Sequence, residues 1–105
     1  MTLLMDFAWG CYPGGVSREL RNGADPNAQD GNGYTALIWL CRMYDRHFRE
    51  RKRMFRCLVR YGASITLRDI VGQDILDHAK DGAERRFRRF VQSEVRRIKK
   101  ARSKA

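Results

Sequence analysis

The sequence predicts an all-α fold in which similar pairs of helices stack side by side. Segments of the chain resemble one another at a constant offset of 39 residues. Each segment also holds two runs whose apolar residues recur at helical spacing. The chain has 105 residues and is 43% hydrophobic, which is enough for one core. We therefore expect a single domain over residues 1–105.

The internal repeat is visible as four aligned pairs of positions. Residues 21–24 (RNGA) align with 60–63 (RYGA), residues 29–30 with 68–69, Gly33 with Gly72, and Leu37 with Leu76. Within each unit a helical run ends in Gly-Ala, a polar stretch follows, and Asp-x-x-Gly precedes the next helical run. Each unit is therefore predicted to be helix, loop, hairpin and helix.

Residue types at the unit boundaries support these helix limits. Gly23 and Gly62 follow apolar runs, where a helix C-terminus favours left-handed backbone. Thr35 and Asp74 lie where a side-chain oxygen accepts from the free amides of the next helix. The exchange of threonine for aspartate between the units keeps this capping role.

Residues 23–37, GADPNAQDGNGYTAL, resemble the ankyrin repeat, whose pattern is Asp-x-x-Gly-x-Thr-Pro-Leu-His-x-Ala with a later Gly-Ala-Asp-x-Asn. Ala36 replaces the usual proline, Ile38 and Asp77 replace the usual histidine, and the period is 39 where the family has about 33. The resemblance covers about residues 2–92. It implies an ankyrin-type helix-loop-helix solenoid with short hairpin-like loops, to which the residues at the end of the chain add a long basic C-terminal helix.

The alignment divides the chain into two and a half to three repeats. Repeat 1 covers about residues 2–29 and lacks its hairpin, so the chain is expected to begin inside an inner helix. Repeat 2 covers about 30–68 with a six-residue insertion, and repeat 3 covers about 69–92 and continues into a basic helix over 93–105. Three units are near the lower limit for such stacks.

The insertion in repeat 2 is expected to lengthen both helices of that repeat by about one turn. The charged stretch 49–53, Arg-Glu-Arg-Lys-Arg, would then form an exposed bend between them. The final helix also has an apolar stripe that runs past the usual length. We expect the elongated repeat 2 helices, through Tyr44 and Phe48, to cover Val95 and Ile98.

The charge of the chain is high and unevenly distributed. Lys and Arg number 22 against 12 Asp and Glu, a net charge of +10, and residues 83–105 alone carry +8. The basic segments admit three interpretations, namely a solvated face, a nuclear-import signal, or a surface for phosphates or acidic protein. The candidate anion-binding residues are Arg85, Arg86, Arg88, Arg89, Arg96, Arg97, Lys99 and Lys100.

Several other classes of protein are disfavoured. No uncharged run approaches the roughly 18 residues of a membrane span, and the start of the chain holds Asp6 without a basic stretch, unlike a secretion signal. Cys11, Cys41 and Cys57 lie in apolar runs and are expected to be buried free thiols. We therefore expect an intracellular protein of the cytoplasm or nucleus.

No catalytic residue, metal site or cofactor is predicted. His47 lies six and ten residues from Cys41 and Cys57, unlike the short ligand pairs of structural zinc sites. Asp74, Asp77, His78 and Asp81 share a helix face that could hold a cation or serve acid-base chemistry. The stronger interpretation is that these acids complement the helix dipole and that Asp77 and Asp81 face Arg42 or Arg46.

The resemblance implies non-catalytic protein binding along the hairpin tips and the concave face of the inner helices. Position by position it implicates Trp9, Asn32, Tyr34, Arg42, Met43, Ile70, Val71, Gln73, Asp77 and Asp81. Ile70 and Val71 are apolar where a free tip would be polar, which favours a contact. Trp39 is expected in the core, whereas Trp9 is equally consistent with a binding hot spot and with burial.

The alternative function is electrostatic binding of nucleic acid or another anionic surface through the basic C-terminal helix. Aromatic residues do not interleave the last ten positions, which disfavours sequence-specific reading of nucleic acid. A phosphate-dominated complex weakens steeply with salt, whereas a concave-face protein complex weakens modestly. With so few repeats, folding is also compatible with self-association.

Overall fold

The computed structural model describes residues 2–42, 47–82 and 85–103, and within them it contains six helices and no strand. The helices are α1 (Leu3–Trp9), α2 (Pro13–Arg21), α3 (Ala36–Arg42), α4 (Phe48–Arg60), α5 (Ile75–Gly82) and α6 (Arg85–Ser103). The predicted all-α fold is confirmed.

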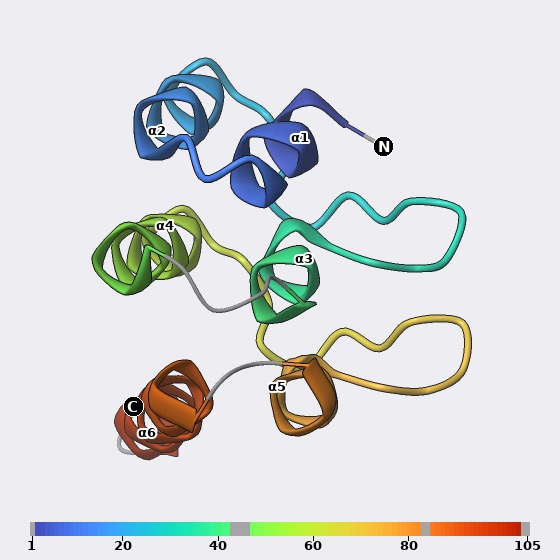
Figure 1. The fold of residues 1–105 in the computed structure, drawn as a ribbon, viewed down its shortest axis with the longest axis vertical. Coiled ribbons are helices and arrows are strands. Elements are labelled where there is room, and N and C mark those ends of the chain that lie inside the picture. Colours follow the sequence, from blue (N-terminus) through green and yellow to red (C-terminus); the bar gives the residue numbers. More distant parts are fainter. Residues whose placement is uncertain (1, 43–46, 83–84, 104–105) are drawn as a thin grey trace.

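The six helices form two layers (Figure 1). We call α1, α3 and α5 the inner helices, because the two long loops project from their side of the molecule (Figure 1). We call α2, α4 and α6 the outer helices. Each inner helix contacts the outer helix that follows it, and α3 also contacts the inner helices α1 and α5 on its two sides. The structure is therefore a short solenoid of helix pairs.

Glycines end the first two outer helices, as predicted. Gly23 has φ +92° and Gly62 has φ +96°, which only glycine adopts at no steric cost. The amide after Gly23 reaches back into the last turn, where Ala24 N donates to Glu19 O at 2.9 Å. The chain thereby leaves each outer helix toward the inner side.

The two loops are hydrogen-bonded to each other across one repeat. The side-chain amide of Gln29 donates to Gly33 O at 2.9 Å and to Arg68 O at 3.0 Å. Near the tips, Ile70 N donates to Asn32 O at 3.1 Å. The loops therefore stack in the same order as the helices behind them.

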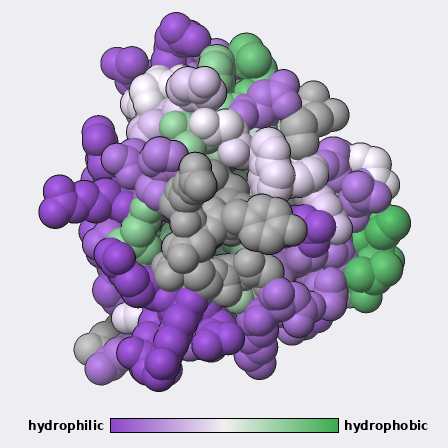
Figure 2. Space-filling view, viewed as in Figure 1, coloured by the Kyte–Doolittle hydropathy of each residue, from purple (hydrophilic) through white to green (hydrophobic). Residues whose placement is uncertain are grey.

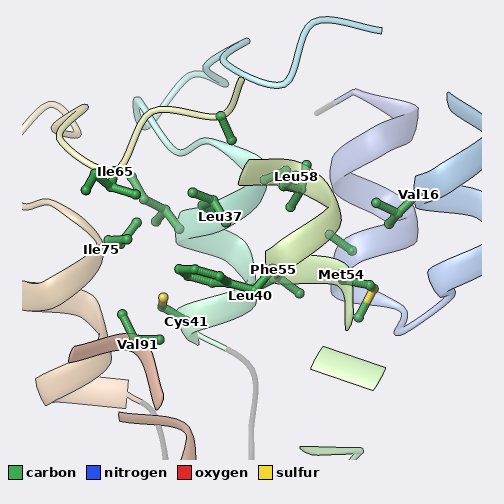
Figure 3. Close-up of a cluster of buried hydrophobic side chains, with 14 of the residues drawn as sticks. Val16, Leu37, Leu40, Cys41, Met54, Phe55, Leu58, Ile65, Ile75 and Val91 are labelled. Carbon is green, nitrogen blue, oxygen red and sulfur yellow. The ribbon is translucent and has the colours of Figure 1, made fainter. Parts of the chain in front are cut away.

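The hydrophobic core lies between the two layers and is continuous along the stack. Leu37 and Leu40 of α3, Phe55 and Leu58 of α4 are each 0% exposed, and Ile75 of α5 is 1% exposed (Figure 3). Because their side chains come from successive repeats, each helix pair completes the core of its neighbours.

The predicted exposed bend at residues 49–53 is wrong, because these residues lie in the first turns of α4. Helical spacing puts Arg51 on the same face as Phe55 and Leu58, so it enters the core and is 0% exposed. Its guanidinium donates to Leu40 O at 2.9 Å and lies 3.9 Å from the ring centre of Phe87.

The insertion lengthens the outer helix of repeat 2 at its N-terminal end. The α4 helix has 13 residues, compared with nine in α2. The predicted lengthening of the inner helix concerns residues 43–46, which lie outside the described part of the chain.

The residues that pack against the C-terminal half of α6 also differ from those expected. Val95 and Ile98 are buried, at 3% and 8% exposure, and Ile98 lines a cavity together with Phe55 and Val59 of α4. Phe48 instead packs against the first turns of α6, with its ring centre 6.5 Å from that of Phe87. The α4 and α6 helices run parallel, so early residues meet early residues. Tyr44, the other predicted cover, lies outside the described residues.

Two composition-based expectations can be placed on the structure. Cys11, Cys41 and Cys57 are free thiols, but only Cys41 is buried as expected, and Cys11 and Cys57 are half-buried. Burial raises the pKa of Cys41 to about 12, so this thiol stays protonated. None of the described helices combines the length and the apolar character that a bilayer crossing requires.

Candidate partner-binding surface

The first hairpin is organised by the carboxylate of Asp30. Its Oδ1 accepts from Asn32 N at 2.9 Å and from Tyr34 N at 3.0 Å. Its Oδ2 accepts from the indole Nε1 of Trp39, on α3, at 3.0 Å. One side chain therefore closes the turn and ties it to the inner helix.

The second hairpin repeats this arrangement around Asp69. Its Oδ1 accepts from Val71 N at 3.0 Å and from Gln73 N at 2.9 Å, and its Oδ2 lies 2.7 Å from Nε2 of His78, on α5. Trp39 and His78 are 39 residues apart, as are the two aspartates. Indole and imidazole thus serve as equivalent partners of the hairpin carboxylate.

Both carboxylates are held in the ionised form. Burial raises the pKa of Asp69, but hydrogen bonds from the Gln73 amide, the His78 ring and the Val71 amide outweigh it and lower the pKa below its ordinary value. The pKa of Asp30 is lowered in the same way, with burial opposed by bonds from its own turn and from Trp39.

Four rings form a continuous row along the inner helices, which we call the aromatic row: Trp9, Trp39, Tyr34 and His78. The ring centres of Trp9 and Trp39 are 5.0 Å apart, and those of Trp39 and Tyr34 are 5.2 Å apart. Tyr34 then meets His78 at 5.2 Å. All three contacts are edge-to-face, the favourable geometry for aromatic pairs. The row connects all three repeats.

Arg42 places a positive charge on this row. Its guanidinium lies 4.9 Å from the ring centre of Tyr34 and 3.5 Å from Nδ1 of His78. Because arginine only donates, this contact favours the tautomer in which Nδ1 accepts and Nε2 carries the hydrogen toward Asp69. The imidazole is 3% exposed and has a polar neighbour at each nitrogen, which fixes its orientation.

The exposure of the row refines two predictions. Trp39 was expected in the core, and it packs against the core but is half-buried, with its indole N–H turned to the hairpin carboxylate. Trp9 is 41% exposed and rests on Trp39, so it combines a packed face with an open one. Tyr34 is half-buried between its neighbours. The rings of the row are therefore packed on one another, and the row is most open to solvent at Trp9.

The hairpin tips differ in polarity. Ile70 and Val71 are each 73% exposed at the second tip, whereas Gly31 and Asn32 occupy the first. Figure 2 shows a hydrophobic patch at the edge of the molecule where the loop between α4 and α5 projects. Gln73 is half-buried, and its backbone closes the turn on Asp69.

The predicted acidic positions on α5 do not meet Arg42 as expected. Asp77 accepts from Asp74 N at 3.0 Å and Asp74 from Asp77 N at 3.1 Å, so the two cap the start of the helix reciprocally. It is His78 that lies against Arg42. Asp81 is exposed on α5. Arg46 and Met43 fall outside the described residues.

The predicted anion-binding residues lie along α6, on the opposite layer from the aromatic row. Arg88 is half-buried, and the exposed members are Arg85, Arg86, Arg89, Arg96, Arg97, Lys99 and Lys100. Two of them are engaged within the chain, since Arg86 lies 4.1 Å from the Phe48 ring centre and Arg97 donates to Glu94 at 2.8 Å. The bond from Arg97 lowers the pKa of Glu94.

Sequence reasoning missed three functional features, namely the two hairpin carboxylates and the place of His78 in the row. The repeat offset held the signal, because it pairs Asp30 with Asp69 and Trp39 with His78. No cluster of three or more His, Cys, Asp or Glu suited to a metal occurs within residues 2–42, 47–82 and 85–103.

Comparison with known proteins identifies the fold. No family model and no curated protein sequence matches the chain. The structure is similar to the crystal structure of EF0377, an ankyrin repeat protein, with a TM-score of 0.66 and 26% sequence identity. The match covers 74% of this chain and 39% of that protein, so the chain spans well under half of the protein it matches. The six helices therefore have the architecture of a short ankyrin repeat array.

Proposed function

We propose that this ankyrin array is a non-catalytic module that binds a protein partner through the aromatic row and the apolar tip of the second hairpin. The observation that carries the proposal is the exposure of Ile70 and Val71, 73% each, on a hairpin whose backbone is held by Asp69. Apolar side chains on a rigid, protruding turn lose little conformational entropy when a partner covers them.

The aromatic row supplies the second part of the surface. Trp9 is 41% exposed and edge-packed on Trp39, and large aromatics of this kind dominate the energetics of interfaces. Arg42 adds a charge beside the rings, and charged groups set orientation and specificity more than affinity. A partner with an apolar segment and an acidic group fits this combination.

The test compares two variants of equal charge change. Ile70→Asp with Val71→Asp places two charges on the tip, and Ser93→Asp with Ala101→Asp places two on exposed positions of α6. Affinity capture with quantitative mass spectrometry compares the proteins retained by each variant and by the wild type. We expect the tip variant to lose partners that the α6 variant retains.

Equal recovery by the wild type and the tip variant would contradict the proposed surface. Circular dichroism melts check that both variants remain folded. Because all four positions are exposed, we expect melting temperatures close to that of the wild type.

A second candidate function is binding of nucleic acid or an acidic surface through α6. It is favoured by the nine Lys and Arg of this helix against one Glu. The opposite capture pattern, in which only the α6 variant loses its partners, would support it. Binding to a single-stranded oligonucleotide should then weaken steeply between about 50 and 200 mM salt.

A further inference from the structure

The outer helices carry the positive charge of the molecule. Together α2, α4 and α6 hold 17 Lys and Arg and three Asp and Glu, a net charge of +14, in a chain whose total is +10. Figure 2 shows the hydrophilic edge of the molecule over these helices. An anionic ligand is therefore drawn to the outer layer, away from the aromatic row.

Two cavities flank α4 on this layer, and they differ in charge. The cavity between α4 and α6, of about 230 Å³, contains Glu94. One carboxylate oxygen of Glu94 accepts from Arg56 Nε at 3.0 Å, and the other accepts from Arg97 Nε at 2.8 Å. Glu94 thereby offsets part of the positive charge that Arg56, Arg60 and Arg97 give this cavity.

The cavity between α2 and α4, of about 280 Å³, has no such carboxylate. Three arginines line it at positions 53, 56 and 60, spaced so that they share one face of α4. The remaining lining residues are the hydroxyl-bearing Ser17 and the apolar side chains of Pro13, Met54 and Cys57. Arg53 and Arg60 are exposed and have no hydrogen bond or ion pair within the described parts of the chain.

We infer that the α2–α4 cavity binds a phosphate monoester. Arg53 and Arg60 supply two guanidinium groups, each of which can offer paired N–H donors to phosphate oxygens. Ser17 adds a hydroxyl donor from the opposite wall. Arg56 remains bonded to Glu94 and contributes positive potential at the rim. The two uncompensated charges match the charge of a monoester at neutral pH.

A monoester fits this cavity better than the backbone of a nucleic acid. A polymer of phosphodiesters needs a continuous basic track, and single strands also need exposed aromatic rings on which bases stack. The neighbouring cavity holds the carboxylate of Glu94 among its arginines, and no aromatic side chain lines the α2–α4 cavity. The monoester can belong to a free phosphorylated molecule or to a phosphorylated side chain of a protein.

The test removes charge inside and outside the cavity in equal amounts. The cavity variant is Arg53→Gln with Arg60→Gln, and the matched control is Arg49→Gln with Arg102→Gln, two exposed positions that do not line the cavity. Calorimetry at fixed salt measures binding of inorganic phosphate, a phosphoserine peptide, its unphosphorylated form and a short single-stranded oligonucleotide. We expect the cavity variant to bind the phosphate probes about tenfold more weakly or worse, and the control to stay within about twofold.

Ser17→Asp provides a second variant that adds a carboxylate instead of removing arginines. It reproduces at the α2–α4 cavity what Glu94 does at the α4–α6 cavity, so phosphate binding should be lost while the melting curve is retained. Similar affinity for inorganic phosphate and the phosphopeptide would support a free ligand. Tighter binding of the phosphopeptide would support a phosphorylated protein.

Three results would overturn the inference. They are equal losses in the cavity and control variants, tighter binding of the oligonucleotide than of the phosphopeptide, and no binding of either phosphate probe by the wild type. The tip variant Ile70→Asp with Val71→Asp lies on the other layer and should bind phosphate normally. The experiments can therefore contradict the proposed phosphate site and the proposed partner surface independently of each other.

Discussion

The two hairpins use the same bonds but meet different neighbours. In each, an aspartate closes the turn through two backbone amides and bonds a ring on the next inner helix. The first hairpin, however, is followed by the second, which packs against its tip through the bond from Ile70 N to Asn32 O. The second hairpin has no described segment beyond it (Figure 1).

This difference distinguishes the residues that form the turn itself from the residues that allow a second hairpin to pack against it. The turn needs an aspartate and a glycine with positive φ, and both hairpins have them. The packing of one hairpin on the next limits the space for side chains only in a hairpin that is followed by another. Equivalent substitutions in the two hairpins therefore measure how much the packing of one hairpin on the other contributes to the free energy of unfolding. Side chains at the tip of the second hairpin are the least restricted by such packing.

The largest expected contrast is between Gly33→Ala and Gly72→Ala. Both glycines have positive φ, +78° and +85°. A Cβ at Gly33 would lie 2.8 Å from the backbone nitrogen of Ile70, whereas a Cβ at Gly72 meets nothing within 4 Å. We expect Gly33→Ala to lower the free energy of unfolding by about 3 to 4 kcal/mol and Gly72→Ala by about 1 to 2 kcal/mol, measured by urea unfolding.

Equal losses for the two glycine variants would show that hairpin stacking contributes nothing beyond the turn itself. Amide hydrogen exchange at Ile70 provides a further check. Its amide should lose protection in Gly33→Ala and keep it in Gly72→Ala, because only the first change displaces its bond to Asn32.

The next contrast is between Asp69→Ala and Asp30→Ala. Each carboxylate accepts three hydrogen bonds, but Asp69 is 8% exposed and its partner His78 is 3% exposed, whereas Asp30 and Trp39 are half-buried. Water can replace lost bonds only at the more open site. We expect losses of about 3 kcal/mol for Asp69→Ala and about 2 kcal/mol for Asp30→Ala in urea unfolding. A larger loss at Asp30 would contradict this ranking.

The architecture was predictable from sequence because its determinants are local. Gly23 and Gly62 end outer helices, and Thr35 and Asp74 cap inner ones, each through bonds that reach only a few residues along the chain. The constant offset then required the units to adopt the same structure. Local chemistry and periodicity together were sufficient for the fold class.

The side-chain environments were less predictable, because they depend on contacts between different helices and hairpins. Arg51 was assigned to a bend from its charge, although its helical phase with Phe55 and Leu58 places it in the core. Trp39 was assigned to the core from its mid-helix place between Leu37 and Leu40, and it is only half-buried there because its indole N–H bonds to Asp30. His78 meets its partner Asp69 only after the intervening hairpin has folded, nine residues away.

A smaller effect is expected from pH. Burial raises the pKa of Asp69, but the bonds from Gln73, His78 and Val71 lower it further, so the folded-state pKa lies below the unfolded value of about 3.9. The ionised Asp69 carboxylate therefore contributes its full stabilisation of the folded state above the unfolded-state pKa. This stabilisation is lost as the pH falls through the folded-state pKa. Between about pH 5 and pH 2.5, the advantage of the wild type over Asp69→Asn in urea unfolding should narrow. An advantage that grows on acidification would show the opposite linkage.

The smallest expected effect concerns the residues that follow the hairpins. Thr35 Oγ1 accepts from Ile38 N at 3.2 Å, and Asp74 Oδ1 accepts from Leu76 N at 3.0 Å and Asp77 N at 3.1 Å. Since threonine already caps the equivalent helix, Asp74→Thr should cost about 0.5 kcal/mol, mainly through the lost charge at the helix N-terminus, whereas Asp74→Ala should cost about 1 kcal/mol. Thermal unfolding at low and high salt separates the two contributions, because added salt should shrink the cost of Asp74→Thr and leave most of the cost of Asp74→Ala. If Asp74→Thr is as damaging as Asp74→Ala, the two hairpins do not share one capping scheme, and their equivalence is limited to the turn.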